Sequence, residues 1–515
     1  MKTSSGAKNK EDLNLLMNSL IQYGPKIIQN RPLVKMALAM GENYLIKDGK
    51  ERKKNNPASL PGITDDQTDM SLALLHSVSR ILMDRKLSDA TYEKAARVLG
   101  KDLLVEKSER NEKARKFIED HGIAQPSFLV ISPSKACNLR CTGCYADSDA
   151  QVQTLEWDIV DRVVGEARSL WGVQFIVVSG GEPLAYRSQG KTLLDLAEAH
   201  PDEYFMFYTN SLLITDEVAQ RMADLGNLIP MISLEGWQER TDARRGAGVF
   251  EKVMASMDRL YITGVLYGVS LTATSQNAEE ILSDDFIDFL VEKKHAAMGW
   301  IFQYMPIGRS FTLDLMPSPE QRLKMWKQTW HHVRDRRIFL ADFWNHGTVV
   351  DGCLSAGGHG NGGYMYLDWN GNFSPCVFVP YSPVNIKEIY GRGGTLMDLY
   401  DEPFFADIRN WQTQIKAQTN GKNLLNPCPM RDHNAVLRQF IRKHEVEPTD
   451  HNAAEALQDA NYAKGMDAYD AHWQHIVDGL WEKKYVRNET VNDPEINKLV
   501  QSADVKIPED AITSG

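Results

Sequence analysis

The sequence predicts an α/β fold, and two observations support this prediction. Strand-like and helix-like patterns alternate between residues 126 and 310, as a chain of repeated βα units requires. Several strand-like runs end in polar residues, such as Thr209 and Asn210, which is typical of the ligand-binding rim of a parallel sheet. Helical patterns also dominate before residue 125 and after residue 435.

The expected elements can be placed in chain order. Apolar residues at helical spacing run from 11 to 47, and a polar linker at 50–57 precedes helices expected at 69–84, 88–98 and 107–121. Expected strands cover 127–132, 173–179, 204–209, 229–234, 265–273 and 297–304. Helices between them are expected at 157–170, 190–200, 215–226, 249–263 and 279–294. Late helices are expected at 435–443, 452–463 and 468–483.

Three cysteines follow the first expected strand, at Cys137, Cys141 and Cys144. One loop with this C-x3-C-x2-C spacing can deliver three thiolates, which suits a [4Fe–4S] cluster with one iron left open. A structural zinc site is the first alternative, but zinc takes four closed ligands and only three are local. A disulfide framework is the second, although it suits short secreted chains better than one of 515 residues with 6 cysteines.

The cysteine run resembles the signature loop of the radical S-adenosylmethionine (radical SAM) enzymes, and two later stretches strengthen the resemblance. Residues 173–184 end in Gly180-Gly181-Glu182-Pro183, which resembles the family's GGEP motif. Residues 232–250 resemble a stretch that usually reads S-x-D-G followed by R-G. Its matching residues here are Ser233 and Arg245, with Glu235 where the family more often has aspartate.

The resemblance implies a partial (β/α)6 barrel over residues 126–345 and an enzyme that reductively cleaves S-adenosylmethionine (SAM). It implies that the first three cysteines hold the SAM-binding [4Fe–4S] cluster. The cofactor-binding residues implied by the resemblance are Tyr145, Gly180, Gly181, Glu182, Pro183, Ser233, Glu235 and Arg245. A non-catalytic iron–sulfur scaffold or redox sensor is the alternative, and it would not need these residues.

The other three cysteines, Cys353, Cys376 and Cys428, lie together in the last third of the chain. A hairpin with an Asn370-Gly371 turn separates the first two. This arrangement resembles the SPASM or Twitch extension and implies an auxiliary domain at 346–440 with a second [4Fe–4S] cluster. Its fourth iron is either open or closed by one further ligand, and the alternative is three buried free thiols. The candidates for that ligand are His433, Asp432 and His359.

Composition limits the partners that the sequence predicts. The net charge is −11, which argues against general nucleic-acid binding, and no apolar run is long enough to span a bilayer. Oxygen-sensitive clusters and reduced thiols favour a cytoplasmic location. Radical SAM chemistry implies a one-electron donor such as flavodoxin or ferredoxin.

The terminal regions carry the predictions about substrate. Residues 1–125 are expected to be a helical region and 441–515 a helical tail. The basic amphipathic stretch 11–47 either contacts a membrane surface peripherally or packs on the barrel. The substrate is therefore left open between a peptide, a lipid and a small molecule.

Overall fold

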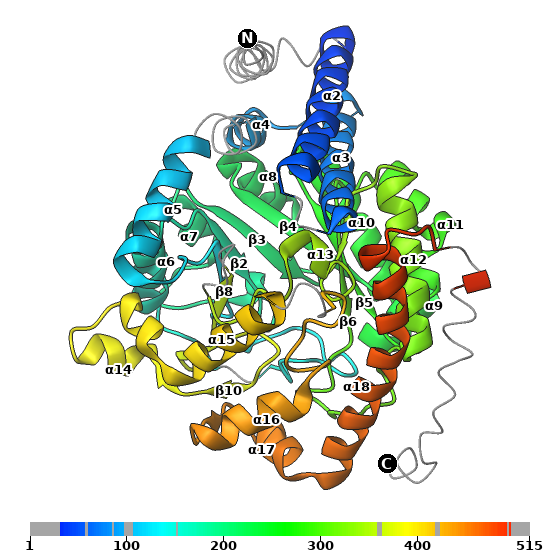
Figure 1. Cartoon of the computed structure of the whole chain (residues 1–515). Helices are drawn as coiled ribbons and strands as arrows, with labels where there is room; N and C mark the ends of the chain where they lie inside the picture. The colour runs from blue at the N-terminus through cyan, green and yellow to red at the C-terminus, as the bar shows by residue number, and fades with distance from the viewer. Residues whose placement is uncertain are drawn as a thin grey trace.

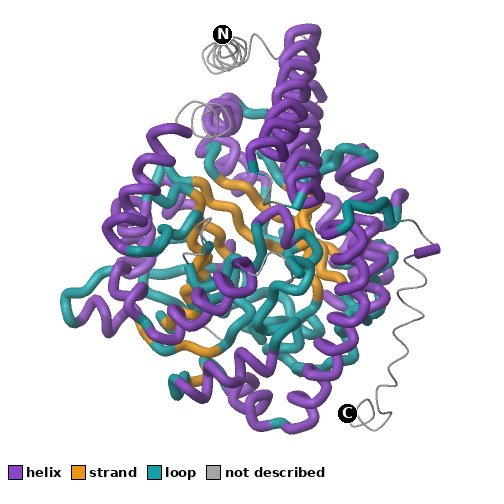
Figure 2. The backbone as a smooth tube through the Cα atoms, viewed as in Figure 1, coloured by secondary structure: helices purple, strands orange, loops and turns teal. Residues whose placement is uncertain are grey.

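The structure is a computed structural model that describes residues 31–56, 60–84, 87–96, 107–150, 153–357, 363–417, 423–491 and 494–495. A ten-stranded sheet lies at its centre, with helices packed around it (Figures 1 and 2). Seven consecutive strands are parallel to their neighbours, and six of them confirm predicted strands. They are β1 (Phe128–Ile131), β2 (Phe175–Val178), β3 (Tyr204–Thr209), β4 (Leu228–Leu234), β5 (Gly268–Ala273), β6 (Gly299–Gln303) and the unpredicted β7 (Leu340–Asp342).

The parallel sheet curves into an open barrel. Tyr208 on β3 and Phe302 on β6 meet edge to face with ring centroids 5.1 Å apart, although β4 and β5 separate their strands in the sheet. In a flat sheet, strands three places apart are about 14 Å from one another. One face of the strands therefore encloses a lumen, and the barrel stays open because β7 and β11 (Val384–Asn385) are the two edges.

The helices that follow the strands begin and end at clear sequence signals. Thr215 accepts a hydrogen bond from the N–H of Val218 at the start of α8 (Asp216–Leu225), and Gly226 ends that helix with a left-handed backbone. Gly264 ends α10 (Val249–Thr263) in the same way. Four predicted helices are confirmed: α6 (Trp157–Trp171), α7 (Leu193–Ala199), α8 (Asp216–Leu225) and α10 (Val249–Thr263).

Two helical features between the strands differ from the prediction. The stretch 279–294 is not one helix, because the Ser283 side chain accepts from the N–H of Phe286 and starts a new helix there. A helix that was not predicted, α9 (Gln238–Arg245), follows β4. The divided stretch consists of η3 (Glu280–Leu282), α11 (Asp284–Asp288) and η4 (Phe289–Lys293).

The late hairpin joins the same sheet as the barrel strands. Its first strand, β8 (Tyr364–Leu367), pairs in parallel with β1, and β9 (Asn372–Ser374) folds back antiparallel to β8. The predicted hairpin is confirmed, but the prediction of a two-residue turn is wrong. The Asp368 side chain accepts hydrogen bonds from the N–H groups of Asn370 and Asn372, and these bonds stabilise a longer connection. A separate small sheet joins β10 (Tyr381–Ser382) to β12 (Glu447–Pro448).

The N-terminal helices include a hairpin that extends from the body of the molecule. Figure 1 shows α2 (Arg31–Asn55) beside α3 (Pro61–Asp84). The predicted linker is wrong at its start, because α2 continues past Lys50, and α3 begins earlier than expected with proline at its first position. Residues 11–30 lie outside the described residues, so membrane contact stays a prediction. No helix among the described residues is long and apolar enough to cross a membrane.

The two ends of the described chain share a second core. Apolar residues of α3 pack against Trp330 on α12 (Pro319–Arg334) and Trp473 on α18 (Ala460–Trp481). The predicted helix at 452–463 is divided, because the Asp459 side chain accepts from two N–H groups and starts α18. The remaining helices are η2 (Pro183–Ala185), α4 (Asp89–Ala96), α5 (Lys107–His121), α13 (Gly347–Val350), α14 (Ile386–Gly391), η5 (Leu396–Asp401), α15 (Pro403–Ala417), α16 (Asn434–Lys443), α17 (His451–Gln458) and η6 (Glu482–Val486).

Candidate active site

The first three cysteines line one end of a cavity of about 370 Å³ inside the barrel. Cys137, Cys141 and Cys144 are free and partly exposed, and they lie in the loop that leaves β1. Their thiols are close enough that Cys141 and Cys144 contribute to the raised pKa of Cys137, although burial is the main cause of that rise to about 12. The loop therefore presents three thiols to a shared space.

Two arginines hold the backbone of this cysteine loop. Arg309 donates from Nη1 to the carbonyl oxygen of Cys141 at 2.7 Å and from Nε to Asp147 at 2.9 Å. Arg244 donates from Nε to the carbonyl oxygen of Thr142 at 3.1 Å. We did not predict either role, because no local sequence pattern links these arginines to carbonyl groups far away in the chain.

The predicted glycine turn lies directly against the cysteine loop. The N–H of Gly181 donates to the carbonyl oxygen of Ser134 at 2.9 Å, and a Cβ at Gly181 would lie 2.1 Å from the carbonyl oxygen of Ala136. Gly180 has a φ of 106°, and its N–H donates to the hydroxyl of Tyr145 at 2.9 Å. Close backbone approach therefore explains why glycine occupies this turn.

Glu182 is a buried carboxyl group at the same end of the cavity. It accepts from the hydroxyl of Thr209 at 2.7 Å, the N–H of Asn210 at 2.8 Å and the N–H of Leu184 at 3.1 Å. Burial raises its pKa to about 7, and these hydrogen bonds oppose the rise. Pro183, the next residue, begins η2 and is not among the residues that line the cavity.

The third predicted stretch places a pair of arginines beside the cavity. Ser233, Arg244 and Arg245 line it, whereas Glu235 lies behind the arginines. Glu235 accepts from Arg245 Nε at 2.9 Å and forms an ion pair with Arg244 Nη1 at 2.6 Å. The unpredicted helix α9 makes this possible, because both arginines lie in its last turn. Glu235 therefore holds the two guanidinium groups in place.

The rest of the cavity is the barrel lumen, and aromatic and aliphatic side chains dominate it. The charged side chains of the cavity lie at the cysteine end. Among the described residues that line the rest of it, only tyrosines and cysteines can ionise. The indole N–H of Trp300 and the amide oxygen of Gln303 have no hydrogen-bond partner among the described residues. The lumen rings are those of Phe128, Phe175, Tyr208, Trp300, Phe302, Phe343, Tyr364 and Phe378.

The other three cysteines also come together in space. Cys353 and Cys376 both contribute to the raised pKa of the Cys428 thiol, for which burial is the main cause. The hydroxyl of Tyr364, which lines the lumen, lies 2.9 Å from the sulfur of Cys376. Phe378 donates its N–H to the same sulfur at 3.4 Å, and its ring meets that of Tyr145 at 5.8 Å. This second group of thiols therefore borders the lumen.

The candidates for a fourth ligand have other partners where the structure describes them. Asp432 forms a fully buried ion pair with Arg322, and His433 Nε2 lies 2.9 Å from the carbonyl oxygen of Asn426. His359 lies outside the described residues. Within the described ranges, no three histidine, cysteine or acidic side chains converge closely enough to hold a single metal ion.

The sequence comparisons agree with the arrangement of these groups. The model of the Radical SAM superfamily matches residues 131–282, which span the cysteine loop, the glycine turn and the two arginines. The mycofactocin maturase MftC of Mycolicibacterium smegmatis is 26% identical over 303 residues, which cover 57% of this chain and 75% of that protein. Residues 131–282 therefore belong to the radical SAM superfamily.

Other relatives of this radical SAM enzyme carry different names. The AdoMet-dependent heme synthase of Methanosarcina barkeri is 25% identical over 293 residues, covering 51% of this chain and 80% of that protein. Among solved structures, Streptococcus suis SuiB bound to the precursor peptide SuiA has a TM-score of 0.47 at 16% identity, covering 67% of this chain and 83% of that one. The family implies a [4Fe–4S] cluster and SAM.

The residues of this radical SAM enzyme fit those two groups. Three thiols at one end of the cavity are the soft donors that iron–sulfur clusters take. A buried carboxyl group and a guanidinium group lie at the same end, and they complement the ammonium and carboxylate of an amino acid.

Proposed function

We propose that this radical SAM enzyme acts on a precursor peptide, and that the reacting part of the peptide is uncharged and mainly apolar. The observation that carries the proposal is the single cavity that joins the first cysteine triad, the glycine turn and the aromatic lumen. We assign Cys137, Cys141 and Cys144 to the SAM-binding cluster.

Each group at the cysteine end has an assigned task. When bound, the reduced cluster supplies an electron that splits SAM into methionine and a 5′-deoxyadenosyl radical, which takes hydrogen from the substrate. Glu182, in its ionised form, and the carbonyl groups of the glycine turn accept hydrogen bonds from the ammonium group of SAM. Ser233 and Arg245 donate to its carboxylate, and Glu235 keeps the guanidinium of Arg245 in position.

The lumen supports the assignment of an apolar reacting group. A charged group would lose its hydration there without meeting an opposite charge among the described residues that line the lumen beyond the cysteine end, and that loss is costly. The unpaired N–H of Trp300 and the unpaired amide oxygen of Gln303 can each form a hydrogen bond with one polar atom of the substrate. Water excluded by the surrounding rings cannot quench a radical.

The names of two relatives favour a precursor molecule as the substrate. One relative is named a maturase, and the sporulation killing factor maturation protein SkfB of Bacillus subtilis, 27% identical over 268 residues, is named for maturation. We propose a peptide as the precursor and flavodoxin or ferredoxin as the electron donor. A lipid with an unreactive alkyl chain is the competing substrate that the test below distinguishes.

We also propose a second [4Fe–4S] cluster at Cys353, Cys376 and Cys428. Three soft thiols that border the lumen support it, together with the existing partners of Asp432 and His433, which favour an open fourth iron. Tyr364 bonds the sulfur of Cys376 and lines the lumen, so this site would lie next to the bound substrate.

The test uses anaerobically reconstituted full-length protein with SAM and a chemical reductant. Iron per chain and released 5′-deoxyadenosine are measured with a peptide fraction and with a lipid fraction from deuterated cells. About eight irons, and deuterium transfer into deoxyadenosine from the peptide fraction alone, would support the proposal. Transfer from the lipid fraction alone would overturn the peptide assignment. The control variant carries Cys137→Ala, Cys141→Ala and Cys144→Ala, and it should release no deoxyadenosine.

A further inference from the structure

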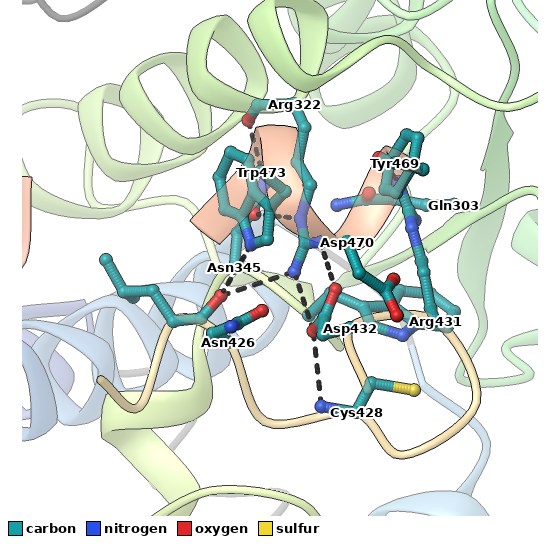
Figure 3. A network of polar contacts seen from close by, with 12 residues as sticks. Gln303, Arg322, Asn345, Asn426, Cys428, Arg431, Asp432, Tyr469, Asp470 and Trp473 are labelled. Atoms are coloured by element: carbon teal, nitrogen blue, oxygen red, sulfur yellow. Dashed lines mark hydrogen bonds and ion pairs between the residues drawn. The ribbon is translucent and has the colours of Figure 1, made fainter. Parts of the chain in front are cut away.

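Arg431 is a buried cation in the turn that carries Cys428. The carbonyl oxygen of Cys428 accepts from the N–H of Asp432 at 2.8 Å, and this bond closes the turn around Arg431. The Arg431 side chain is 0% exposed. Figure 3 shows Cys428, Arg431 and Asp432 on this short segment below α18.

The guanidinium of Arg431 has few partners for a buried charge. It donates one hydrogen bond, from Nη2 to the hydroxyl of Tyr469, whereas Nε and Nη1 have no partner among the described residues. Its central carbon lies 5.1 Å from the ring centroid of Tyr469 and 5.7 Å from that of Trp344. Aromatic faces attract a cation, but they do not replace a counter-charge in a dry interior.

The carboxyl groups near Arg431 do not supply that counter-charge. Asp432 forms its buried ion pair with Arg322. Asp470 follows Tyr469, and burial raises its pKa to about 9, so it is neutral at pH 7. Among the described residues, Arg431 has no ion pair with any carboxylate.

Trp344 contacts both Arg431 and Cys428 of the second cysteine triad. Besides facing Arg431, Trp344 lowers the pKa of Cys428 through a side-chain hydrogen bond, although burial raises that pKa overall. Three thiolates around a four-iron core make an anion, and reduction makes this anion more negative. A buried cation with two free N–H groups is thus close to the place where the proposed cluster would bring negative charge.

We propose that Arg431 is the counter-charge of an iron–sulfur cluster held by Cys353, Cys376 and Cys428, and that it raises the reduction potential of this cluster. The inference rests on the second cluster of the proposed function. A nearby cation stabilises the reduced form more than the oxidised form, because the reduced form is more negative. Arg431 is a positioning residue in this scheme and does not touch the substrate.

The test isolates the second site by using full-length protein with Cys137→Ala, Cys141→Ala and Cys144→Ala. Iron per chain and the midpoint potential are measured by redox titration with electron paramagnetic resonance. The substitutions compared in this background are Arg431→Gln, Arg431→Lys, Arg438→Gln and Asp470→Asn. Arg438 is the matched control, because it lies nearby on α16 and has its own partner, Asp467, at 2.7 Å.

We expect Arg431→Gln to lower the midpoint potential enough to change the ratio of reduced to oxidised cluster tenfold, which is about 59 mV for one electron. Arg431→Lys should restore most of this shift, and the other two variants should keep the original midpoint. Loss of iron in Arg431→Gln but not in Arg431→Lys would also support a role of charge.

Three results would overturn the proposal. An unchanged midpoint in Arg431→Gln at full iron content would show that the charge does not act on the cluster. Equal loss of iron in the glutamine and lysine variants, with iron retained in Arg438→Gln, would leave only a packing role. A background protein that binds no iron would remove the second cluster itself, and the role of Arg431 with it.

Discussion

Arg309 donates a hydrogen bond to the carbonyl oxygen of Cys141 over 2.7 Å, although 168 residues separate them in the chain. The backbone N–H of Arg309 also donates to the carbonyl oxygen of Cys144 at 3.0 Å. The loop after β6 therefore fixes two of the three cysteines through their backbone. Preorganised thiols lose less conformational entropy when a cluster binds.

Replacing Arg309 should weaken the first cluster site. Arg309→Ala removes three charged hydrogen bonds from a partly buried side chain, and each is worth about 1.5–3 kcal/mol. We expect lower iron content at the first site, measured in a Cys353→Ala, Cys376→Ala and Cys428→Ala background. Arg392→Ala, which removes an exposed ion pair, serves as the control. Equal iron in both proteins would contradict a role for Arg309.

Arg245 gives the most direct test of SAM binding. Arg245→Ala should weaken SAM binding by about 1.5–3 kcal/mol, the range for a lost hydrogen bond to a charged group. Calorimetry with anaerobic reconstituted protein measures the affinity. Arg240→Ala is a matched control on the same helix, because Arg240 is 42% exposed and is not among the cavity-lining residues. An unchanged affinity in Arg245→Ala would place Arg245 outside the cofactor site.

The contact between the glycine turn and the cysteine loop predicts a steric effect. Gly181→Ala would place a methyl group 2.1 Å from the carbonyl oxygen of Ala136, so the two loops would have to separate. We expect lower stability and lower iron content, measured by thermal unfolding and iron analysis. Gly165→Ala is the control, because its added Cβ meets nothing within 4 Å and alanine stabilises a helix by about 1 kcal/mol over glycine.

The sequence predicted the functional groups that belong to short, recognisable motifs. The cysteine spacing, the Gly180-Gly181 turn and Arg245 fall within runs of a few residues, and the structure brings them to one cavity. The role of Arg309 and Arg244 in holding the cysteine loop was not predicted. Their acceptors are backbone carbonyl groups, which every residue has, so no sequence pattern identifies them. The parallel pairing of β8 with β1 was missed because it joins strands more than two hundred residues apart.

Asp470 predicts how stability depends on pH. Burial raises its pKa from 3.8 to about 9, so the folded protein keeps a proton that the unfolded chain loses above about pH 4. Stability should therefore fall as the pH rises from about 4 towards 9. Asp470→Asn should remove this part of the dependence and stabilise the protein more at pH 8 than at pH 5, as denaturant unfolding would show. Asp467→Asn, an exposed neighbour on α18, should change the difference little.

The buried ion pair of Arg322 and Asp432 connects the core to Cys428. Both side chains are 0% exposed, and Asp432 also accepts from the N–H of Cys428 at 3.2 Å (Figure 3). Arg322→Met would leave a lone buried carboxylate, so we expect a loss of about 3–5 kcal/mol in the free energy of unfolding. Lys324→Met on the same helix breaks an exposed pair and should cost less than about 1 kcal/mol.

The double variant separates the charge of this pair from its packing. Arg322→Met with Asp432→Asn leaves no buried charge, and the asparagine oxygen can still accept from the N–H of Cys428. It should therefore recover most of the stability that Arg322→Met loses, together with the iron content of the second site. If the double variant is no more stable than Arg322→Met alone, the loss comes from the missing hydrogen bonds to Asn345 and Leu425 and from the lost contact with the Trp473 ring.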